Sequence, residues 1–312
     1  RYYEDLLHGT VGYENVETNA RGRVLRVLDR TDPLPGKDLI LNIDARIQKV
    51  AQDALQGERG SVVALDPRDG AVIAFVSTPS FDPNLFVGGI SGKDYRMLND
   101  SLDLPLYNRS TMGQYPPGST IKPIVGLAGL EYGVVTPSTA IYDPGYYRLP
   151  NDRRNYRDWK RGGHGNRIDI HIALEQSCDV YYYDLAYNLG VDQIHEFGDL
   201  FGLGRPSGID LPVERPGLLP SREWKRANRN EPWYPGETLN IGIGQGYMLT
   251  TPLQLAVSTA AIASRGKLIQ PRILKSVSGE VPEQPVASQF AIKNPMNWDI
   301  IAEGMEAVVH GA

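Results

Sequence analysis

A serine and a lysine three residues apart, Ser119 and Lys122, are the residues of this sequence best suited to nucleophilic chemistry. Residues three apart in a helix lie on the same face, about one turn from each other. A serine hydroxyl is a weak nucleophile until a base removes its proton, and a lysine can be that base when burial favours its neutral form. A base placed in this way typically raises a rate by about 10²–10⁴-fold. The pair therefore predicts an activated serine, with Ser119 as nucleophile and Lys122 as its base.

The context of Ser119 matters because the Ser-x-x-Lys pattern is expected by chance about once in a chain of this length. The sequence holds a second copy of the pattern at residues 264–267, at the end of a predicted helix. Ser119 differs because a Pro-Pro-Gly turn precedes it and residues 120–132, which are apolar almost all round, follow it. Such an apolar helix is expected to be buried. Ser119 would then lie at the N-terminus of a buried helix, where negative charge on its oxygen is favoured.

Ser177 and Asp179 form a second candidate feature, between two predicted helices. Two interpretations remain open. In the structural one, either residue caps the helix that follows. In the functional one, Ser177 relays a proton and Asp179 orients the lysine or the substrate.

A glycine-rich run at residues 242–246 is the third feature. A dinucleotide-binding fingerprint needs a βαβ unit around the glycines and an acidic residue about 20 positions later, and the sequence has neither. A tight backbone turn near a cleft is the better interpretation. Gly244, Gln245 and Gly246 are therefore candidate substrate-binding residues.

Four potential metal ligands surround the second feature: Asp143, Asp158, His164 and Cys178. Zinc accepts this mixture of hard and soft ligands in tetrahedral geometry. The spacing is not that of a local zinc motif, and the alternative is a small buried cysteine beside a loop histidine that forms hydrogen bonds. A structural zinc ion at these residues would hold residues 143–167 beside Ser177.

The elements that must position these residues follow from periodicity and turn chemistry. Asp44 is expected to cap a helix that places Ile47 and Val50 on one face and ends near Gly57. Residues 61–65 and 71–77 are expected to form a hairpin around the turn at 66–70. One strand is predicted at residues 23–28, and residues 143–167 are predicted to be a loop. Further helices are predicted at residues 168–176, 180–189, 193–201, 251–264 and 298–309. The expected fold class is mixed α/β (α+β), with an antiparallel sheet that begins with the hairpin.

The overall composition excludes several classes of protein. Of the 312 residues, 41% are hydrophobic and 22% are charged, as in an ordinary soluble globular protein. The net charge of −5, without a long basic run, argues against nucleic acid as a partner. The single cysteine excludes an internal disulfide. No apolar run approaches the roughly 18 residues of a membrane span, and we interpret the chain as an excised piece whose native anchor is outside it.

The motifs together resemble those of class B penicillin-binding proteins. The sequence reads Tyr-Pro-Pro-Gly-Ser-Thr-Ile-Lys-Pro at 115–123, Ser-Cys-Asp at 177–179 and Gly-Ile-Gly-Gln-Gly at 242–246. Residues 1–5, 82–86, 156–159 and 163–165 are similar to one branch of that family, the elongation-type penicillin-binding protein 2. The resemblance runs along nearly the whole chain.

This resemblance implies a peptidoglycan D,D-transpeptidase that cross-links stem peptides through an acyl-serine intermediate during cell elongation, and that β-lactams acylate. The implied catalytic residues are Ser119, Lys122, Ser177 and Asp179, and acyl transfer needs no cofactor. The implied fold has an antiparallel sheet flanked by helices, plus an all-helical lobe. Residues 1–40 would be the remnant of a pedestal domain, and residues 41–312 the transpeptidase domain. The implied location is periplasmic with an inner-membrane anchor, and the implied partners are the rod-shape elongation machinery, including a glycan polymerase.

Two departures from the family pattern stand out. Asp179 takes the place of the more usual asparagine in the second motif, as is common in this branch. The third motif, a strand with Lys-Ser/Thr-Gly, is absent, and we expect it to follow residue 312, so that the last sheet strands are missing and the chain as given has impaired activity. Three rival functions remain: a hydrolase on the same scaffold, a non-catalytic sensor or scaffold, and a nucleotide-binding protein.

Overall fold

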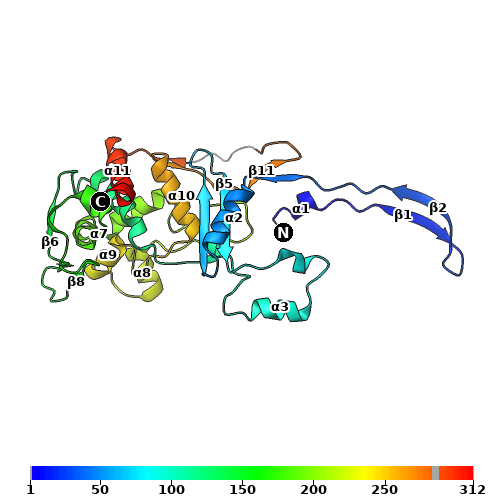
Figure 1. Ribbon diagram of the computed structural model, residues 1–312, viewed down its shortest axis with the longest axis horizontal. Coiled ribbons are helices and arrows are strands. Elements are labelled where there is room, and N and C mark those ends of the chain that lie inside the picture. Colours follow the sequence, from blue (N-terminus) through cyan, green and yellow to red (C-terminus); the bar gives the residue numbers. More distant parts are fainter. Residues whose placement is uncertain (1, 283–287, 312) are drawn as a thin grey trace.

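The computed structural model describes residues 2–282 and 288–311, and in it a slender hairpin extends from a helix-rich body (Figure 1). The α-helices are α1 (Glu4–Leu7), α2 (Ala45–Ala54), α3 (Gly92–Asn99), α4 (Arg109–Met112), α5 (Lys122–Glu131), α6 (Ile170–Glu175), α7 (Asp179–Leu200), α8 (Arg222–Arg229), α9 (Pro235–Gly242), α10 (Pro252–Ala263) and α11 (Met296–His310). Two 3-10 helices are assigned, η1 (Pro83–Phe86) and η2 (Gly118–Ile121).

The described strands form antiparallel pairs rather than one large sheet. The pairs are β1 (Tyr13–Thr18) with β2 (Val24–Thr31), β3 (Leu39–Leu41) with β11 (Leu274–Val277), β4 (Gly60–Leu65) with β5 (Val72–Thr78), β6 (Ile141–Asp143) with β9 (Gly165–Ile168), β7 (Tyr146–Tyr147) with β8 (Tyr156–Arg157), and β10 (Lys267–Leu268) with β12 (Ser288–Gln289). The class is mixed α/β, as the sequence predicts.

The arm formed by β1 and β2 is exposed along its whole length. It lies at the opposite end of the molecule from β6 and β8 (Figure 1). The strand predicted at residues 23–28 is part of β2, whereas β1 was not predicted. At the base of the arm, the Tyr3 hydroxyl donates a hydrogen bond to the Asp210 carboxylate, which also accepts from the amides of Ile273 and Leu274. The Asp210 carboxylate therefore links the base of the arm to residues 273–274 of the body, beside the pairing of β3 with β11.

The hairpin of β4 and β5 and the cap of α2 agree with the sequence prediction. The Asp44 side chain accepts from the amides of Arg46 and Ile47. The apolar face of α2 is not buried, because Val50 is 68% exposed and no residue of the helix is fully buried. The helix is instead attached by the Gln48 amide, which exchanges two hydrogen bonds with the backbone of Phe75 in β5. Polar docking of this kind leaves no signal in the hydrophobic pattern.

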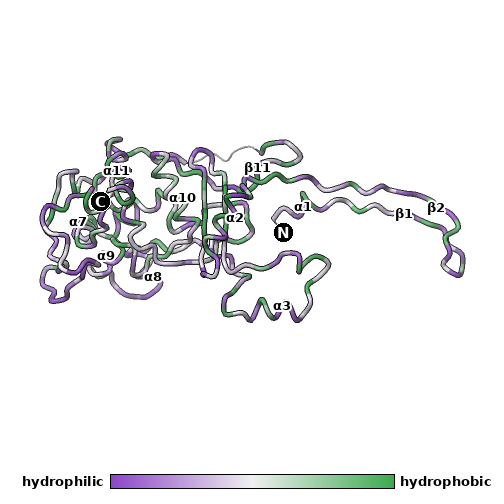
Figure 2. Tube along the Cα trace, in the orientation of Figure 1, coloured by the Kyte–Doolittle hydropathy of each residue, from purple (hydrophilic) through white to green (hydrophobic). Residues whose placement is uncertain are grey.

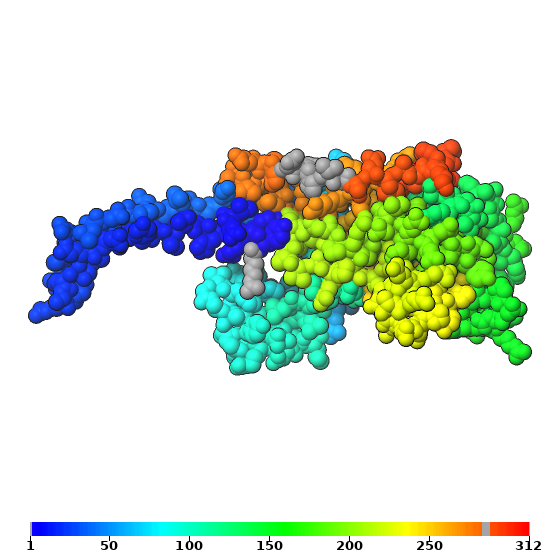
Figure 3. Space-filling view, turned by 180° about the vertical axis from the view of Figure 1, so that it is seen from behind, coloured from blue at the N-terminus to red at the C-terminus, as the bar shows by residue number. Residues whose placement is uncertain are grey.

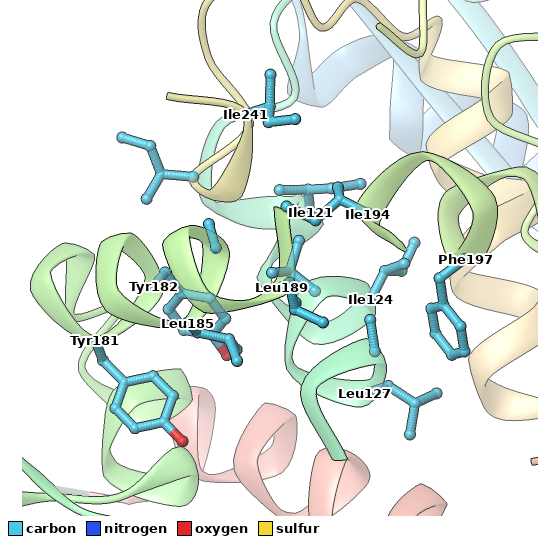
Figure 4. Packing of buried hydrophobic residues seen from close by; sticks show 14 of the residues in the cluster. Ile121, Ile124, Leu127, Tyr181, Tyr182, Leu185, Leu189, Ile194, Phe197 and Ile241 are labelled. Carbon is cyan, nitrogen blue, oxygen red and sulfur yellow. The ribbon is translucent and has the colours of Figure 1, made fainter. Parts of the chain in front are cut away.

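The core lies around α5, which is buried from Lys122 to Leu130. Figure 4 shows Ile121, Ile124 and Leu127 facing residues of α7, including Tyr182 and Leu185. Helices α6, α7 and α11 all pack on α5. The prediction of a buried helix at residues 120–132 is confirmed, and this rigid helix carries the candidate nucleophile at its N-terminal end.

Several elements differ from the prediction in extent. The two helices predicted at residues 180–189 and 193–201 agree with the two halves of α7, which is broken at Gly190, where φ is +77° and ψ is 160°. The predicted loop at residues 143–167 contains the short strands β6 to β9, and this end of the molecule is largely hydrophilic (Figure 2). Helices α3, α8 and α9 were not predicted. The part of the chain around α3 forms a lobe beside the body (cyan in Figure 3).

Within the described ranges, none of the helices combines the length and apolar character that crossing a membrane requires.

Candidate active site

Ser119 lies in η2, immediately before the buried helix α5, and its side chain is exposed. The turn before it is fixed by Gly118, whose φ is +57° and whose amide donates to the carbonyl of Gly244 at 2.8 Å. Gly244 itself has a φ of +71°, and a Cβ at this residue would come within 2.2 Å of the Gly118 carbonyl oxygen. Only glycine fits at this approach. The glycine-rich run is therefore a tight turn beside the nucleophile, with Gln245 and Gly246 exposed.

Lys122 lies one turn after Ser119 and is 1% exposed. Its Nζ is 2.8 Å from the Ser177 carbonyl oxygen, 3.1 Å from Ser177 Oγ and 2.6 Å from Asp179 Oδ1. The Tyr182 ring lies beneath the Nζ, with its centroid 5.3 Å away. An ammonium has three donors and no acceptor, so these three acceptors match a protonated Lys122. The buried cation is thus compensated by a single carboxylate.

The hydrogen-bonded connection from Lys122 to Ser119 passes through Ser177, because Ser177 Oγ is 2.9 Å from Ser119 Oγ. None of the hydrogen bonds in the described part of the chain joins Lys122 Nζ to Ser119 directly. In this arrangement Lys122 donates to Ser177, and Ser177 donates to Ser119. When Lys122 is neutral its lone pair can accept, so that both hydroxyls can turn and the proton of Ser119 can move toward the lysine. The hydrogen bonds thus connect the predicted base to the predicted nucleophile through the second candidate serine.

The segment of residues 177–179 presents alternate side chains to opposite sides. Ser177 and Asp179 face Lys122, whereas Cys178 faces the other way and forms the N-cap of α7 through Sγ and the Tyr181 amide. The structural interpretation, in which Ser177 or Asp179 caps α7, is therefore wrong. Ser177 has a φ of +54°, which is unusual for a residue other than glycine. Strained backbone of this kind persists where the surroundings hold it, and it is concentrated at functional sites.

A groove of about 580 Å³ runs from Thr120, next to Ser119, along β4 and α10. Its lining includes Val63 and Leu65 of β4 and Leu255 and Ala256 of α10. Its walls are mostly apolar, and one end of it lies beside the candidate nucleophile.

A second polar cluster lies on the other side of residues 177–179. It contains Asp143, Asp158, His164 and Cys178, which each offer one ligand atom, and these atoms all lie within 4.8 Å of one another. His164 Nδ1 is 2.7 Å from Asp143 Oδ2 and 3.7 Å from Asp158 Oδ1. The side chains of all three of these residues are fully buried. The structure thus brings together the four residues that the sequence analysis singled out as ligands.

The electrostatics of this cluster favour a cation. Burial disfavours the charged form of Asp143, but hydrogen bonds from the His164 side chain and the amides of Gly145 and His164 lower its pKa overall. Burial raises the pKa of the Cys178 thiol well above its usual range, and the neighbouring charges of Asp143 and Asp158 raise it further. His164 Nε2 is buried without a hydrogen-bond partner. Two buried carboxylates beside a thiol and one histidine therefore leave negative charge uncompensated.

The loop that carries these ligands is attached to the first cluster at two points. Asp158 Oδ2 accepts from the amides of Asp179 and Val180 at the first turn of α7, at 2.7 and 3.0 Å. The Trp159 indole N–H donates to the Ser177 carbonyl at 3.1 Å, while its ring packs edge-on to His164. Trp159 was not among the predicted site residues. Its position directly after a proposed ligand was the available signal.

The second Ser-x-x-Lys pattern, the decoy at residues 264–267, lacks the hydrogen-bonded arrangement of Ser119 and Lys122. Ser264 Oγ bonds to the carbonyls of Ala260 and Lys267, and Lys267 Nζ reaches the carbonyl of Arg68. Neither side chain contacts the other by a hydrogen bond, so the pattern here is a helix end.

Comparison with known families gives two matches. The family described as the penicillin-binding protein transpeptidase domain matches residues 60–312. The family described as the penicillin-binding protein dimerisation domain matches residues 1–41.

Curated relatives are similar along nearly the whole chain. The peptidoglycan D,D-transpeptidase MrdA of Acinetobacter baumannii is 51% identical over 304 residues, which is 97% of this chain and 44% of the relative. MrdA of Escherichia coli K12 is 44% identical over 314 residues, which is 99% of this chain and 49% of the relative. The chain thus spans about half the length of the curated relatives it matches.

Solved structures match the whole fold. Pseudomonas aeruginosa PBP2, in a complex with WCK 5153, superposes with a TM-score of 0.91 at 51% identity, covering 100% of this chain and 65% of that one. Helicobacter pylori PBP2, in a complex with MreC, superposes with a TM-score of 0.89 at 33% identity, covering 100% of this chain and 56% of that one. A chain of a peptidoglycan synthase complex that coordinates polymerisation and cross-linking superposes with a TM-score of 0.87 at 36% identity. This match covers 99% of the present chain and 56% of that one.

Proposed function

The chain belongs to the penicillin-binding protein transpeptidase family, and from this premise we propose that it carries the acyl-transfer site of a peptidoglycan D,D-transpeptidase. The observation that carries the proposal is the continuous hydrogen-bonded chain from exposed Ser119 through Ser177 to buried Lys122. A chain of this kind gives a serine hydroxyl a route for its proton.

The proposed reaction begins when Ser119 Oγ attacks the carbonyl carbon of a D-alanyl-D-alanine peptide bond. Its proton passes through Ser177 to neutral Lys122, and the same route returns a proton to the nitrogen of the departing D-alanine. The Ser119 amide lies in the first turn of η2, where amides lack intrahelical acceptors, and it supplies one donor to the oxyanion. An amine of a neighbouring stem peptide then attacks the ester, releases Ser119 and completes the cross-link.

β-Lactams are proposed to acylate the same serine, and this gives the test. Full-length protein is incubated with a penicillin, and intact mass is measured for wild type, Ser119→Ala and Ser264→Ala. The last variant is the matched control, because Ser264 belongs to the decoy Ser-x-x-Lys pattern. We expect one drug mass on the wild type and on Ser264→Ala, and none on Ser119→Ala. An adduct that survives in Ser119→Ala would refute the assignment, and absence of any wild-type adduct would favour the scaffold function.

The same experiment separates the transpeptidase from a hydrolase on this scaffold. A hydrolase would release the drug within minutes, whereas we expect the adduct to persist. The measurement is the fraction of acylated protein over several hours after free penicillin is removed.

The proposed architecture divides the chain into a pedestal remnant at residues 1–40 and a transpeptidase domain at residues 41–312. In support, the arm of β1 and β2 projects from the body and is tied to it near Asp210 (Figure 1).

We further propose that β4 and β5 belong to a larger antiparallel sheet whose last strands follow residue 312. Among the described strands, β4 pairs only with β5, which leaves its other edge open toward the groove.

The proposed setting is the periplasm, with an inner-membrane anchor and partners from the rod-shape machinery. The support comes from the similar structures, which include a PBP2 in complex with MreC and a chain of a complex that combines polymerisation with cross-linking. Co-purification of the full-length protein with a glycan polymerase from detergent-solubilised membranes would test the second partner.

We also propose a structural zinc site at Asp143, Asp158, His164 and Cys178. The donor set fits, because it combines two carboxylates, an imidazole and a thiol, which zinc accepts together. Ligands at zinc distances of about 2.0–2.3 Å lie about 3.3–3.8 Å apart in a tetrahedron, so atoms within 4.8 Å of one another need to move by only about 1 Å. Bound zinc would supply the positive charge that the cluster lacks and would hold the loop beside Ser177.

Elemental analysis of protein purified without chelators tests this site. We expect about one zinc per chain in the wild type, as the tetrahedral donor set implies. His164→Ala should lose it, and His171→Ala should keep it, because His171 lies outside the cluster and contacts Glu175 only at 4.0 Å. Less than about a tenth of a metal per wild-type chain would end the proposal.

A further inference from the structure

Positive charge is concentrated in one short stretch of the chain, residues 146–161. This stretch holds six Arg or Lys side chains against two Asp, whereas the rest of the sequence holds 26 basic against 35 acidic side chains. All six basic residues are exposed, and we call them the basic face: Arg148, Arg153, Arg154, Arg157, Lys160 and Arg161. An acidic protein thus carries a short exposed stretch of opposite charge.

The charges of the basic face are not neutralised within the protein. No ion pair involves any of the six among residues 2–282 and 288–311, whereas several exposed arginines elsewhere are paired, as in Arg205–Asp199, Arg222–Asp192 and Arg265–Asp299. Exposed cations held close together repel one another, so the arrangement costs stability unless an anion is bound. The face therefore points to a ligand with several negative charges.

The basic face is held in shape by its own hairpin. Strands β7 and β8 pair with Tyr146 opposite Arg157. The Arg148 guanidinium donates to Asn155 Oδ1 at 3.0 and 2.7 Å and lies over the Tyr146 ring. Arg154 lies over the Tyr156 ring at 5.3 Å. The cations are therefore partly ordered before any ligand binds, which reduces the entropy cost of binding.

The face adjoins the nucleophile. Trp159, between Arg157 and Lys160 in sequence, donates to the Ser177 carbonyl, and Ser177 Oγ contacts Ser119 Oγ. The Trp159 side chain is nonetheless 63% exposed, so one side of the indole is open beside the site. A ligand that reaches Ser119 can therefore extend over Trp159 onto the basic face.

We propose that the basic face binds the carboxylates of stem peptides that neighbour the reacting one on the same peptidoglycan strand. This inference rests on the proposed function. Each stem that ends in D-alanyl-D-alanine carries a free carboxylate, and a strand displays many stems in series, so the charges are complementary. An anionic membrane surface is the other ligand of suitable charge, but a membrane against this face would block access to the adjacent Ser119.

The test measures binding of fluorescently labelled, un-cross-linked peptidoglycan strands to the full-length protein by polarisation. The variant is Arg153→Gln/Arg154→Gln/Arg161→Gln, which leaves the proposed zinc ligands and Trp159 intact. The matched control is Arg21→Gln/Arg23→Gln/Arg26→Gln, which removes the same charge from the arm at the other end of the molecule (Figure 1). A third variant, Arg153→Lys/Arg154→Lys/Arg161→Lys, keeps the charge.

We expect the Gln variant to bind strands about tenfold more weakly at low salt, and the difference to shrink as salt screens the charges. The Lys variant and the control should stay within about twofold of the wild type, since their charge at this face is unchanged. Wild-type protein should also lose about tenfold in affinity when the stem carboxylates are amidated, a result that does not depend on the folding of any variant.

Equal affinity of the Gln variant and the wild type would overturn the inference, as would an equal loss in the arm control. Stronger binding of wild type to phosphatidylglycerol vesicles than to strands would also overturn it, in favour of a membrane. The acylation rate at saturating penicillin is measured in parallel. If the wild-type protein is not acylated, this result would count against the proposed function. The strand affinities would still decide this inference.

Discussion

Two buried polar clusters lie on opposite sides of residues 177–179, and they differ in how their charges are balanced. On one side, Lys122 and Asp179 form an ion pair at 2.6 Å, and every donor of the ammonium has an acceptor. On the other side, Asp143 and Asp158 share one histidine and a thiol, and His164 Nε2 has no partner. The first cluster is balanced within the chain, whereas the second keeps excess negative charge, which suits the proposed zinc ion.

This difference shows that the closeness of acidic and basic side chains does not by itself define the role of a site. Both clusters are buried and both include an acid and a base within hydrogen-bonding distance. A charge-balanced cluster with an exposed hydroxyl at its end is suited to moving a proton, whereas a cluster with excess negative charge is suited to a metal ion. Alternate residues of one short segment serve the two, so each cluster fixes the position of the other.

The largest effect is expected from Lys122→Met. The acylation rate should fall by about 10³-fold, because the serine loses its proton acceptor. Stability should also fall by about 3–5 kcal/mol, because Asp179, 13% exposed in this pair, loses its cation. The measurements are the penicillin acylation rate and denaturant unfolding.

The double variant Lys122→Met/Asp179→Asn separates these two effects. It removes both charges, so that most of the stability should return while acylation stays low. Recovery of acylation together with stability would show that the lysine is only structural, and the proposed contrast between the clusters would fail.

Removal of metal should have the next largest effect. Zinc bound at about a thousandfold above its dissociation constant stabilises a protein by about 4 kcal/mol, so a chelator should lower the melting temperature by about 5–10 °C. Cys178→Ser should melt at the lower temperature with or without the chelator. A chelator that stops acylation as completely as Lys122→Met, without changing the melting temperature, would contradict the assignment of separate roles.

The smallest effect is expected from Trp159→Phe, which acts between the two clusters. The variant keeps a ring against His164 but loses the hydrogen bond to the Ser177 carbonyl, a loss of about 1 kcal/mol or about fivefold in acylation rate. Trp224→Phe, in a helix away from both clusters, is the control and should leave the rate unchanged. An unchanged rate in Trp159→Phe would mean that the indole does not position Ser177.

The sequence predicted most of the regular elements that carry the site. The apolar run after Ser119 is the buried helix α5, the cap at Asp44 begins α2 as expected, and α10 lies within the helix predicted at residues 251–264. These features depend on local periodicity and local hydrogen bonds, which are written in neighbouring residues. The features that the sequence did not predict involve distant partners. Helix α2 is attached to β5 through Gln48, and the strands β6 to β9 pair across a segment with no alternating pattern.

By itself, the sequence determined which residues could do chemistry, namely a serine and a lysine one turn apart before an apolar helix, and four potential ligands in one stretch. The tertiary structure decided how they are connected. Ser177 lies between Ser119 and Lys122, and Cys178 faces the opposite cluster, because α7 packs against α5 and orients residues 177–179 between the two. Chain spacing cannot show this, since contacts between helices depend on how their buried faces pack rather than on the distance along the sequence.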